Sequence, residues 1–161
     1  KNQIFITGRS CGGWMTMMLL ARHQNIVAGG ISFVPECYGR LTKNYKVKKV
    51  GVEEALKKFR KKDGPGPADM RQMQIDEIIK SKNLPVLVFT HPKDPFGGLL
   101  SDWVEKAPGV KRIVVSQDNK VNGKSCKVWG EGIKNFHDID RADCFEYYNS
   151  TILNFINSKL N

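Results

Sequence analysis

The stretch GRSCGG at residues 8–13, here called the elbow, joins two apolar patterns. The run IFIT at residues 4–7 predicts a strand, and the apolar spacing over residues 14–21 predicts a helix. Ser10 is therefore expected at the apex of a sharp turn from strand to helix. The bare pattern Gly-x-Ser-x-Gly also occurs in ordinary turns. Here the strand, the doubled glycine and the helix together favour a serine held above a sheet.

Such a turn gives the serine and its neighbour separate chemical tasks. Ser10 Oγ can attack a carbonyl carbon once a base removes its proton. The N–H of Cys11 then faces the place where an oxyanion would form. The Cys11 thiol is a rival nucleophile, but we expect it to point down the beginning of the helix. We therefore predict Ser10 as the nucleophile and the Cys11 N–H as an oxyanion donor.

Alternating strand and helix patterns run along the chain. We expect strands at residues 3–7, 26–34, 84–90 and 110–116, and helices at 13–23, 52–62, 68–80, 97–106 and 144–160. The strand at 84–90 is apolar on both faces, which is typical of a parallel strand covered on both sides. Right-handed crossovers then predict an α/β fold, a parallel sheet of about four strands with helices on both faces. The length of 161 residues fits a single domain, 1–161.

Residues 40–82 differ in composition from the rest of the domain. They are basic, and GPGP at residues 64–67 separates their two helical patterns. We interpret this segment as a helical cap inserted after the second strand. Asp69, or the residues just before it, is expected to cap the second of these helices.

The net charge of +10, from 26 basic and 16 acidic side chains, raises the question of an anionic partner. The two lysine clusters, at residues 43–49 and 57–62, both fall within the cap. We favour a solvated helical face, with a basic lid over a site for anionic substrates as the alternative. A nucleic-acid partner is the interpretation we favour least. No apolar run approaches the roughly 18–20 residues that span a bilayer, so we expect no membrane partner.

The four cysteines show no Cys-x-x-Cys spacing. We therefore expect no zinc or other metal site, and no cofactor. Cys126 and Cys144 could form a disulfide if the fold brings them together. Otherwise free, partly buried thiols are expected for all four, Cys11 and Cys37 included. The cytoplasm is the favoured compartment, and a periplasmic or secreted location stays open if a signal preceded Lys1.

Candidate catalytic residues follow three of the expected strands, and functional residues gather at the carboxyl ends of parallel strands. Ser10 follows the first strand, Asp94 the third and His137 the fourth. The imidazole of His137 can take and return a proton near neutral pH. Asp94 can hold that imidazole in the required tautomer. We therefore predict a catalytic triad of Ser10, Asp94 and His137, in that chain order.

Other residues compete for the acid and base roles. Asp94 precedes a proline and could be a turn residue, which leaves Asp102 and Asp138 as rivals. His91 directly follows the third strand, close to Asp94 in the sequence. His23 stands at a helix end, where an imidazole can cap carbonyl groups. Chain order and spacing favour the triad given above.

The elbow region resembles the α/β-hydrolase superfamily. The resemblance rests on GRSCGGWMT at residues 8–16, LLARH at 19–23 and VAGGISF at 27–33. Asp94 after the third strand, and His137 before the terminal helix, continue it. The dienelactone-hydrolase and prolyl-oligopeptidase-like branches are the most similar.

This resemblance implies a carboxylesterase-like serine hydrolase that cleaves a small-molecule ester through an acyl-enzyme. One alternative is a serine peptidase of the prolyl-oligopeptidase-like type. The other is a non-catalytic hydrolase-fold fragment that acts as a binding module.

The chain departs from the family pattern in two ways. Phe136 and Asp138 flank His137, where the family usually has a glycine. The resemblance also maps the chain onto the C-terminal half of the family fold, so that it resembles a partial, truncated or processed hydrolase. The family's second oxyanion N–H would lie before Lys1. The first strand would then form a sheet edge, and we expect an N-terminal fragment or a second copy of the chain to pair with it.

Overall fold

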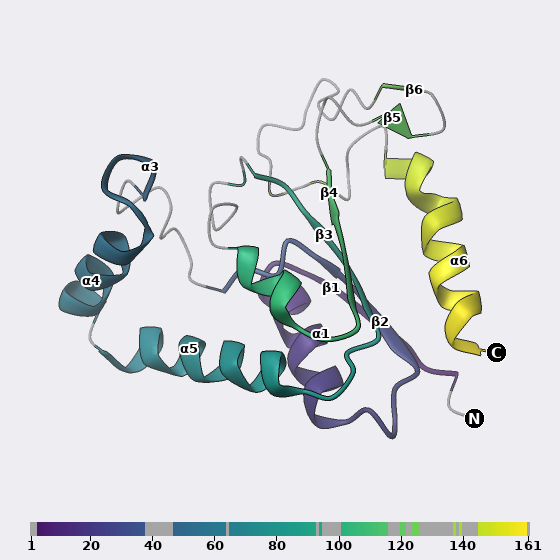
Figure 1. Ribbon diagram of the computed structural model, residues 1–161, viewed down its shortest axis with the longest axis horizontal. Helices are drawn as coiled ribbons and strands as arrows, with labels where there is room; N and C mark the ends of the chain where they lie inside the picture. Colours follow the sequence, from purple (N-terminus) through teal and green to yellow (C-terminus); the bar gives the residue numbers. More distant parts are fainter. Residues whose placement is uncertain are drawn as a thin grey trace.

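The structure, a computed structural model, describes residues 3–37, 47–63, 65–92, 94, 101–115, 120–121, 124–125, 137, 139 and 145–160. A four-stranded parallel sheet carries helices on both of its faces (Figure 1). The prediction of an α/β fold is therefore confirmed. A short antiparallel pair, β5 (Lys120–Val121) and β6 (Lys124–Ser125), was not expected from any sequence pattern.

The main sheet has the strand order β1-β2-β3-β4. Its strands are β1 (Phe5–Arg9), β2 (Gly29–Phe33), β3 (Val86–Thr90) and β4 (Val110–Val114). Each overlaps an expected strand. β1 begins and ends two residues later than expected, so it runs straight into Ser10. Among the described strands β1 pairs with β2, at one end of the order.

The helices alternate with the strands much as the sequence predicts. They are α1 (Cys11–Arg22), α3 (Val47–Val50), α4 (Val52–Asp63), α5 (Pro65–Lys80) and α6 (Asn149–Leu160), with the 3₁₀ helices η1 (Ser101–Lys106) and η3 (Phe145–Tyr148). Of the expected helix at 97–106, the structure describes residues 101–106, which form the 3₁₀ helix η1. Residues 97–100 lie outside the described ranges. None of the helices in the described part of the chain is long and apolar enough to cross a membrane.

β3 supplies apolar side chains to both faces of the sheet. All five of its residues are buried, and successive side chains of a strand point to opposite faces. Val86 and Val88 belong to an apolar cluster that contains Trp14 of α1. Leu87 and Phe89 belong to a second cluster that includes residues of η3 and α6. Burial on both faces explains why this strand has an unbroken apolar sequence.

In the sequence, helices α4 and α5 follow β2 and precede β3, in the region expected to form the cap. Ala55 of α4, and Ile75 and Ile78 of α5, are buried in the same cluster as Trp14. The proline-rich break is shorter than expected because α5 already begins at Pro65. A proline fits the first turn of a helix, where a backbone N–H would have no helical partner. These helices therefore share the main core.

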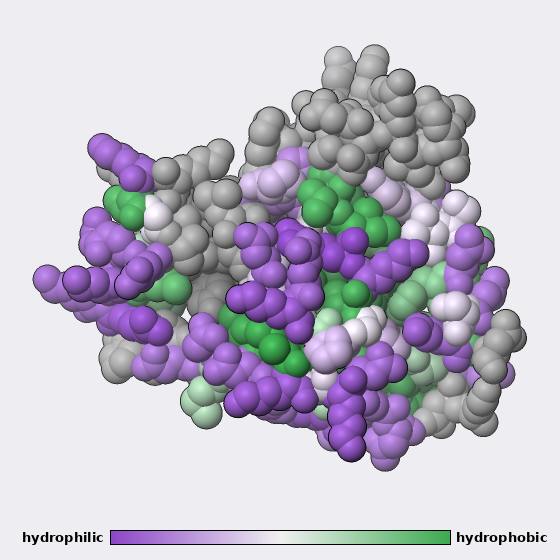
Figure 2. Space-filling view, viewed as in Figure 1, coloured by the Kyte–Doolittle hydropathy of each residue, from purple (hydrophilic) through white to green (hydrophobic). Residues whose placement is uncertain are grey.

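α4 carries the second lysine cluster, and Figure 2 shows hydrophilic residues gathered over this end of the molecule. Lys58 Nζ lies 3.6 Å from Glu54 Oε1 one turn away, and Arg60 Nε donates to Asp69 Oδ1 of α5 at 3.1 Å. Asp69 lies inside α5 and is therefore not its cap, so that prediction is wrong for Asp69. The helix begins four residues earlier than Asp69. Exposed ion pairs of this kind are typical of a solvated helical face.

Candidate active site

Ser10 has a backbone conformation that serine rarely adopts. It stands between β1 and α1 with φ 58° and ψ −126°, in a region favoured by glycine. Its N–H donates to the Phe33 carbonyl of β2 (2.9 Å), and its carbonyl accepts from the Trp14 N–H (2.9 Å). The neighbouring strand and helix therefore hold the strained conformation in place. Strain of this kind is concentrated at functional sites.

Two glycines of the elbow make this geometry possible. A Cβ on Gly8 would collide with the backbone of Gly12. A Cβ on Gly13 would lie 2.8 Å from both Phe33 O and Ser32 Oγ, and the Ser32 hydroxyl donates to the Gly13 carbonyl (3.0 Å). By contrast, a Cβ on Gly12 would meet nothing within 4 Å. Gly8 and Gly13 thus allow α1 to start directly against the ends of β1 and β2.

Asp94 and His137 contact each other although they are 43 residues apart in the sequence. His137 Nδ1 lies 2.8 Å from Asp94 Oδ2, and the exposed fractions of the two side chains are 11% and 1% respectively. The Asp94 N–H donates to the His91 carbonyl (3.0 Å), which fixes the turn after β3. A proton on Nδ1 would leave Nε2 as the accepting nitrogen. The structure thus brings together two of the three residues predicted for the triad.

The rival residues have different surroundings. Asp102 is exposed, and its Oδ1 lies 3.4 Å from Nη1 of Arg112. His23 is exposed at the C-terminal end of α1. His91 is buried at the end of β3, and Asp138 lies outside the described residues. Asp102 and His23 are therefore too exposed to form a buried acid–base pair.

The structure does not join Ser10 to the Asp94–His137 pair. Ser10 Oγ instead donates to the backbone carbonyl of Glu36 at 3.5 Å. This distance is at the long limit for a hydroxyl hydrogen bond, so the contact is weak. Within the part of the chain that the structure describes, no hydrogen bond links Ser10 to His137.

Cys11 contributes to the site through its backbone and through its side chain. It is the first residue of α1, so its N–H has no acceptor within the helix and lies at the positive end of the helix dipole. Its Sγ forms a disulfide with Cys37. The prediction of free thiols is therefore wrong for these two cysteines, because the chain after β2 returns to the start of α1. Cys126 and Cys144 lie outside the described residues.

Glu36 is a site residue that the sequence analysis missed. It follows β2 by three residues, is 2% exposed, and accepts a hydrogen bond at Oε1 from Ser101 Oγ (2.8 Å). Burial raises the pKa of this carboxyl well above its ordinary range. The Ser101 hydrogen bond and the charge of Arg112 oppose that rise in pKa, and the charge of Asp94 adds to it. The available signal was its place at the carboxyl end of a parallel strand.

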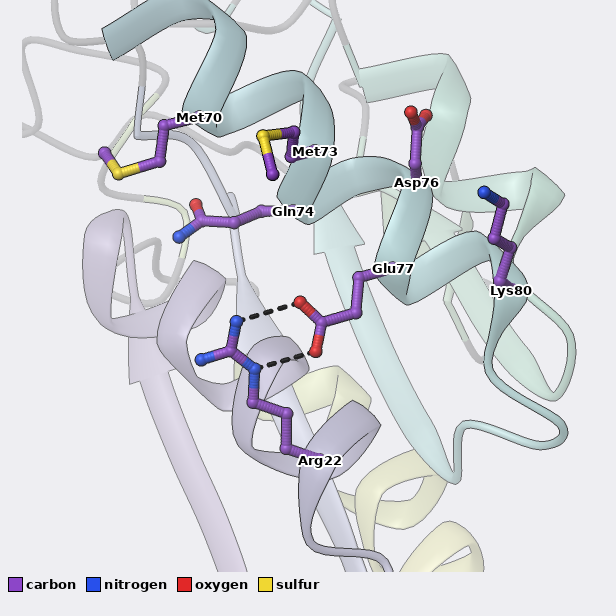
Figure 3. A pocket seen from close by; sticks show the side chains of 7 residues that line it. All are labelled: Arg22, Met70, Met73, Gln74, Asp76, Glu77 and Lys80. Atoms are coloured by element: carbon purple, nitrogen blue, oxygen red, sulfur yellow. Dashed lines mark hydrogen bonds and ion pairs between the residues drawn. The ribbon is translucent and has the colours of Figure 1, made fainter. Parts of the chain in front are cut away.

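A groove of about 700 Å³ lies between α1 and α5 (Figure 3). It is lined by Arg22, Met70, Met73, Gln74, Asp76, Glu77 and Lys80. Arg22 donates two hydrogen bonds to the Glu77 carboxylate, of 2.7 and 2.8 Å. Arg22 ends α1, whereas Gln74 of the lining accepts a hydrogen bond from Trp14 Nε1 (2.9 Å), four residues after Ser10. No cluster of three metal-ligating side chains occurs among the described residues.

No protein-family model matches the chain, and no curated protein matches it. The resemblance of residues 8–16, 19–23 and 27–33 to α/β-hydrolases therefore stays a prediction from the sequence.

Proposed function

We propose that the chain is a serine hydrolase that cleaves a carboxylic ester through an acyl-enzyme. The observation that carries this proposal is the strained turn at Ser10, whose φ of 58° is held by β2 and α1. A serine in an ordinary turn needs no such conformation. The buried pair of His137 and Asp94 offers the acid–base chemistry that a serine nucleophile needs.

In the proposed reaction, each catalytic group acts once in forming the acyl-enzyme and once in hydrolysing it. Ser10 Oγ attacks the ester carbonyl carbon while its proton passes to Nε2 of His137. The tetrahedral oxyanion accepts a hydrogen bond from the Cys11 N–H. The bond to the alcohol oxygen then breaks as His137 returns the proton to that oxygen, which leaves the acyl-enzyme. Water then attacks the acyl carbon while its proton passes to His137, and the bond to Ser10 Oγ breaks as His137 returns that proton to the serine. The acid is released, and Asp94 stabilises the imidazolium in both steps.

The hydrogen bond from Ser10 to Glu36 fits a resting state of this site. Before attack, the Ser10 hydroxyl must leave the Glu36 carbonyl and turn toward His137. A contact of 3.5 Å costs little to break. Catalytic hydrogen bonds are often long or misaligned before a substrate binds.

A second candidate is a hydrolase-fold module that binds a partner without turnover. The same Ser10–Glu36 contact favours it, because the serine is not linked to its base. The position of β1 at the end of the described strand order and the exposure of Ile4 (54%) support a pairing partner at this edge, either an N-terminal fragment or a second copy. Light scattering after size exclusion tests the second copy, and a monomer at high concentration would exclude it.

A fluorophosphonate probe distinguishes the two candidates. We expect it to label the wild type and not Ser10→Ala, with p-nitrophenyl acetate turnover lost in parallel. Ser81→Ala is the matched control, because the Ser81 hydroxyl donates to Ile78 O (2.7 Å) beyond α5, far from the elbow in the sequence. Well-folded wild type that is neither labelled nor active would favour the binding module. Turnover of a prolyl-peptide anilide in place of the ester would favour the peptidase.

A further inference from the structure

Arg71 of α5 lies in the region expected to form the cap, and its side chain contacts two segments next to the elbow. Its Nε donates a hydrogen bond to the Cys37 carbonyl (3.2 Å), and its Nη1 donates to Gln74 Oε1 (2.6 Å). Its Cζ also lies over the Trp14 ring, 5.6 Å from the ring centroid. A planar guanidinium can donate within its plane and stack through its face at the same time. Arg71 therefore links α5 to α1 and to the chain after β2.

One route from Arg71 to Ser10 passes through Trp14. The Trp14 N–H donates to the Ser10 carbonyl (2.9 Å) and so helps to hold the positive φ of Ser10. The Trp14 ring is buried, and its Nε1 donates to Gln74 Oε1 (2.9 Å), the same oxygen that accepts from Arg71. An amide oxygen has two lone pairs, so it can accept from both donors. The side chain of Trp14 is therefore held by α5 through its face and through its nitrogen.

A second route from Arg71 to Ser10 passes through Cys37. The Cys37 carbonyl accepts from Arg71, and its Sγ is bonded to Cys11, the residue directly after Ser10. The residue before Cys37, Glu36, supplies the carbonyl that accepts from Ser10 Oγ. Hydrogen bonds from a charged donor are stronger than those from a neutral one. The chain after β2 is thus fixed to α1 by the disulfide and to α5 by the guanidinium.

A second arginine links the same two helices at a place farther along α1. Arg22 donates two hydrogen bonds to the Glu77 carboxylate of α5, of 2.7 and 2.8 Å. Both side chains are exposed, and Arg22 is the last residue of α1, whereas Trp14 lies in its first turns. An exposed ion pair of this kind contributes little to stability. The two arginines therefore allow a simple link between α1 and α5 to be tested separately from support of the elbow.

We infer that Arg71 is a positioning residue of the proposed hydrolase, which holds Trp14 and Cys37 in place and so fixes the elbow around Ser10. The inference rests on the proposed function. A nucleophile must be held close to the geometry of attack, and a displacement of about 1 Å can lower a rate by about 10²-fold. Arg71 acts through the residues around the reacting serine. Its loss should therefore lower kcat and leave KM nearly unchanged.

Steady-state kinetics with p-nitrophenyl acetate test the inference in three variants that circular dichroism shows to be folded. Arg71→Ala should lower kcat on the order of tenfold, with KM within about twofold of wild type. The rate of fluorophosphonate labelling at Ser10 should fall by a similar factor, because that reaction reports on the nucleophile directly. Arg71→Lys keeps a donor but loses the planar guanidinium, so its kcat should lie between those of Arg71→Ala and wild type. Arg22→Ala should keep the wild-type kcat and labelling rate.

The inference and the proposed function fail in different ways. With an active wild type, a folded Arg71→Ala that keeps the wild-type kcat would overturn the positioning role alone. So would equal losses of kcat in Arg71→Ala and Arg22→Ala, because any link between α1 and α5 would then be enough. If Arg71→Ala does not fold, a wild-type kcat in Arg71→Lys overturns the role and a lowered kcat supports it. A wild type that neither hydrolyses esters nor labels at Ser10 overturns the proposed function and the role with it.

Discussion

Two non-glycine residues in the described part of the chain have positive φ, and they occupy matching places in the sheet. Ser10 follows β1 and Val34 follows β2, and the residues before them, Arg9 and Phe33, are paired in the parallel register. Each donates its N–H to the next strand, Ser10 to Phe33 O and Val34 to Phe89 O. The chain therefore leaves two adjacent strands through the same kind of strained turn.

The two turns differ in what supports them and in what they present. Val34 is 1% exposed and packs in the apolar cluster on the α6 side of the sheet. A β-branched residue at positive φ is a marked outlier, so the packing of Val34 must offset its strain. Ser10 is only partly buried, and backbone contacts and glycines support it. The Ser10 turn carries a hydroxyl group. The Val34 turn leads to Glu36, whose backbone carbonyl accepts a hydrogen bond from that hydroxyl.

The largest effect is expected for Ser10→Gly. Glycine adopts positive φ freely, so the substitution removes the hydroxyl and the strain together. Ester turnover should fall by at least about 10³-fold. The free energy of unfolding should rise by about 1 kcal/mol as strain is relieved. Steady-state rates and urea unfolding measure the two effects, and a loss of stability would show that Ser10 is not strained.

The disulfide that links the two turns should give the next largest effect. Replacing Cys11 and Cys37 by serine opens a loop with a sequence separation of 26. The free energy of unfolding should then fall by about 3 kcal/mol, because the unfolded chain gains entropy. Urea unfolding of wild type with and without a reductant provides the control. Wild type that is equally stable in both conditions would contradict the expectation.

The glycine support of the Ser10 turn can be tested with two neighbouring residues. Gly13→Ala places a Cβ against Phe33 O and should lower the free energy of unfolding by about 1–3 kcal/mol. The Cβ added by Gly12→Ala, in the same helix turn, would meet nothing within 4 Å, and alanine stabilises a helix by up to about 1 kcal/mol relative to glycine. Thermal unfolding should therefore give shifts of opposite sign, and equal shifts would show that close packing of α1 does not set the requirement.

The smallest effect concerns the strain at Val34. Val34→Ala removes two buried methyl groups and should cost about 1–2 kcal/mol of stability. At an unstrained buried position, glycine would cost roughly 0.5–1 kcal/mol more than alanine. Relief of the positive φ should cancel that further loss, so Val34→Gly and Val34→Ala should unfold at nearly the same urea concentration. If Val34→Gly unfolds at a clearly lower urea concentration than Val34→Ala, the turn stores little strain.

The Ser10 turn could be predicted from the sequence because its causes are local. Strand, glycines and helix follow one another within residues 4–21, and the parallel sheet follows from the alternation of such units. Chain order also placed Asp94 and His137 after neighbouring strands, and the structure brings them into contact. Their catalytic roles stay predictions, since Ser10 Oγ is bonded to Glu36 and not to His137.

The disulfide at Cys37 and the burial of Glu36 could not be predicted from the sequence, because both form only when distant parts of the chain pack together. Cys11 and Cys37 have no spacing that indicates pairing, and they join only after α1 and β2 have packed. The raised pKa of Glu36 depends on burial and on the Asp94 carboxyl, 58 positions later in the sequence (94 minus 36). The cap prediction for Asp69 was wrong for a local reason, since a proline fits the first turn of a helix and α5 begins at Pro65.

The bond between Cys11 and Cys37 also makes a covalent ring that contains all of α1 and all of β2. The exposed residues His23–Ile26 lie inside this ring, and exposed loops are the preferred sites of proteolytic cleavage. A single cut there would break the chain without releasing either piece. In an oxidising compartment the nicked protein would keep its elbow covalently attached, whereas a reductant would leave the two pieces held by packing alone.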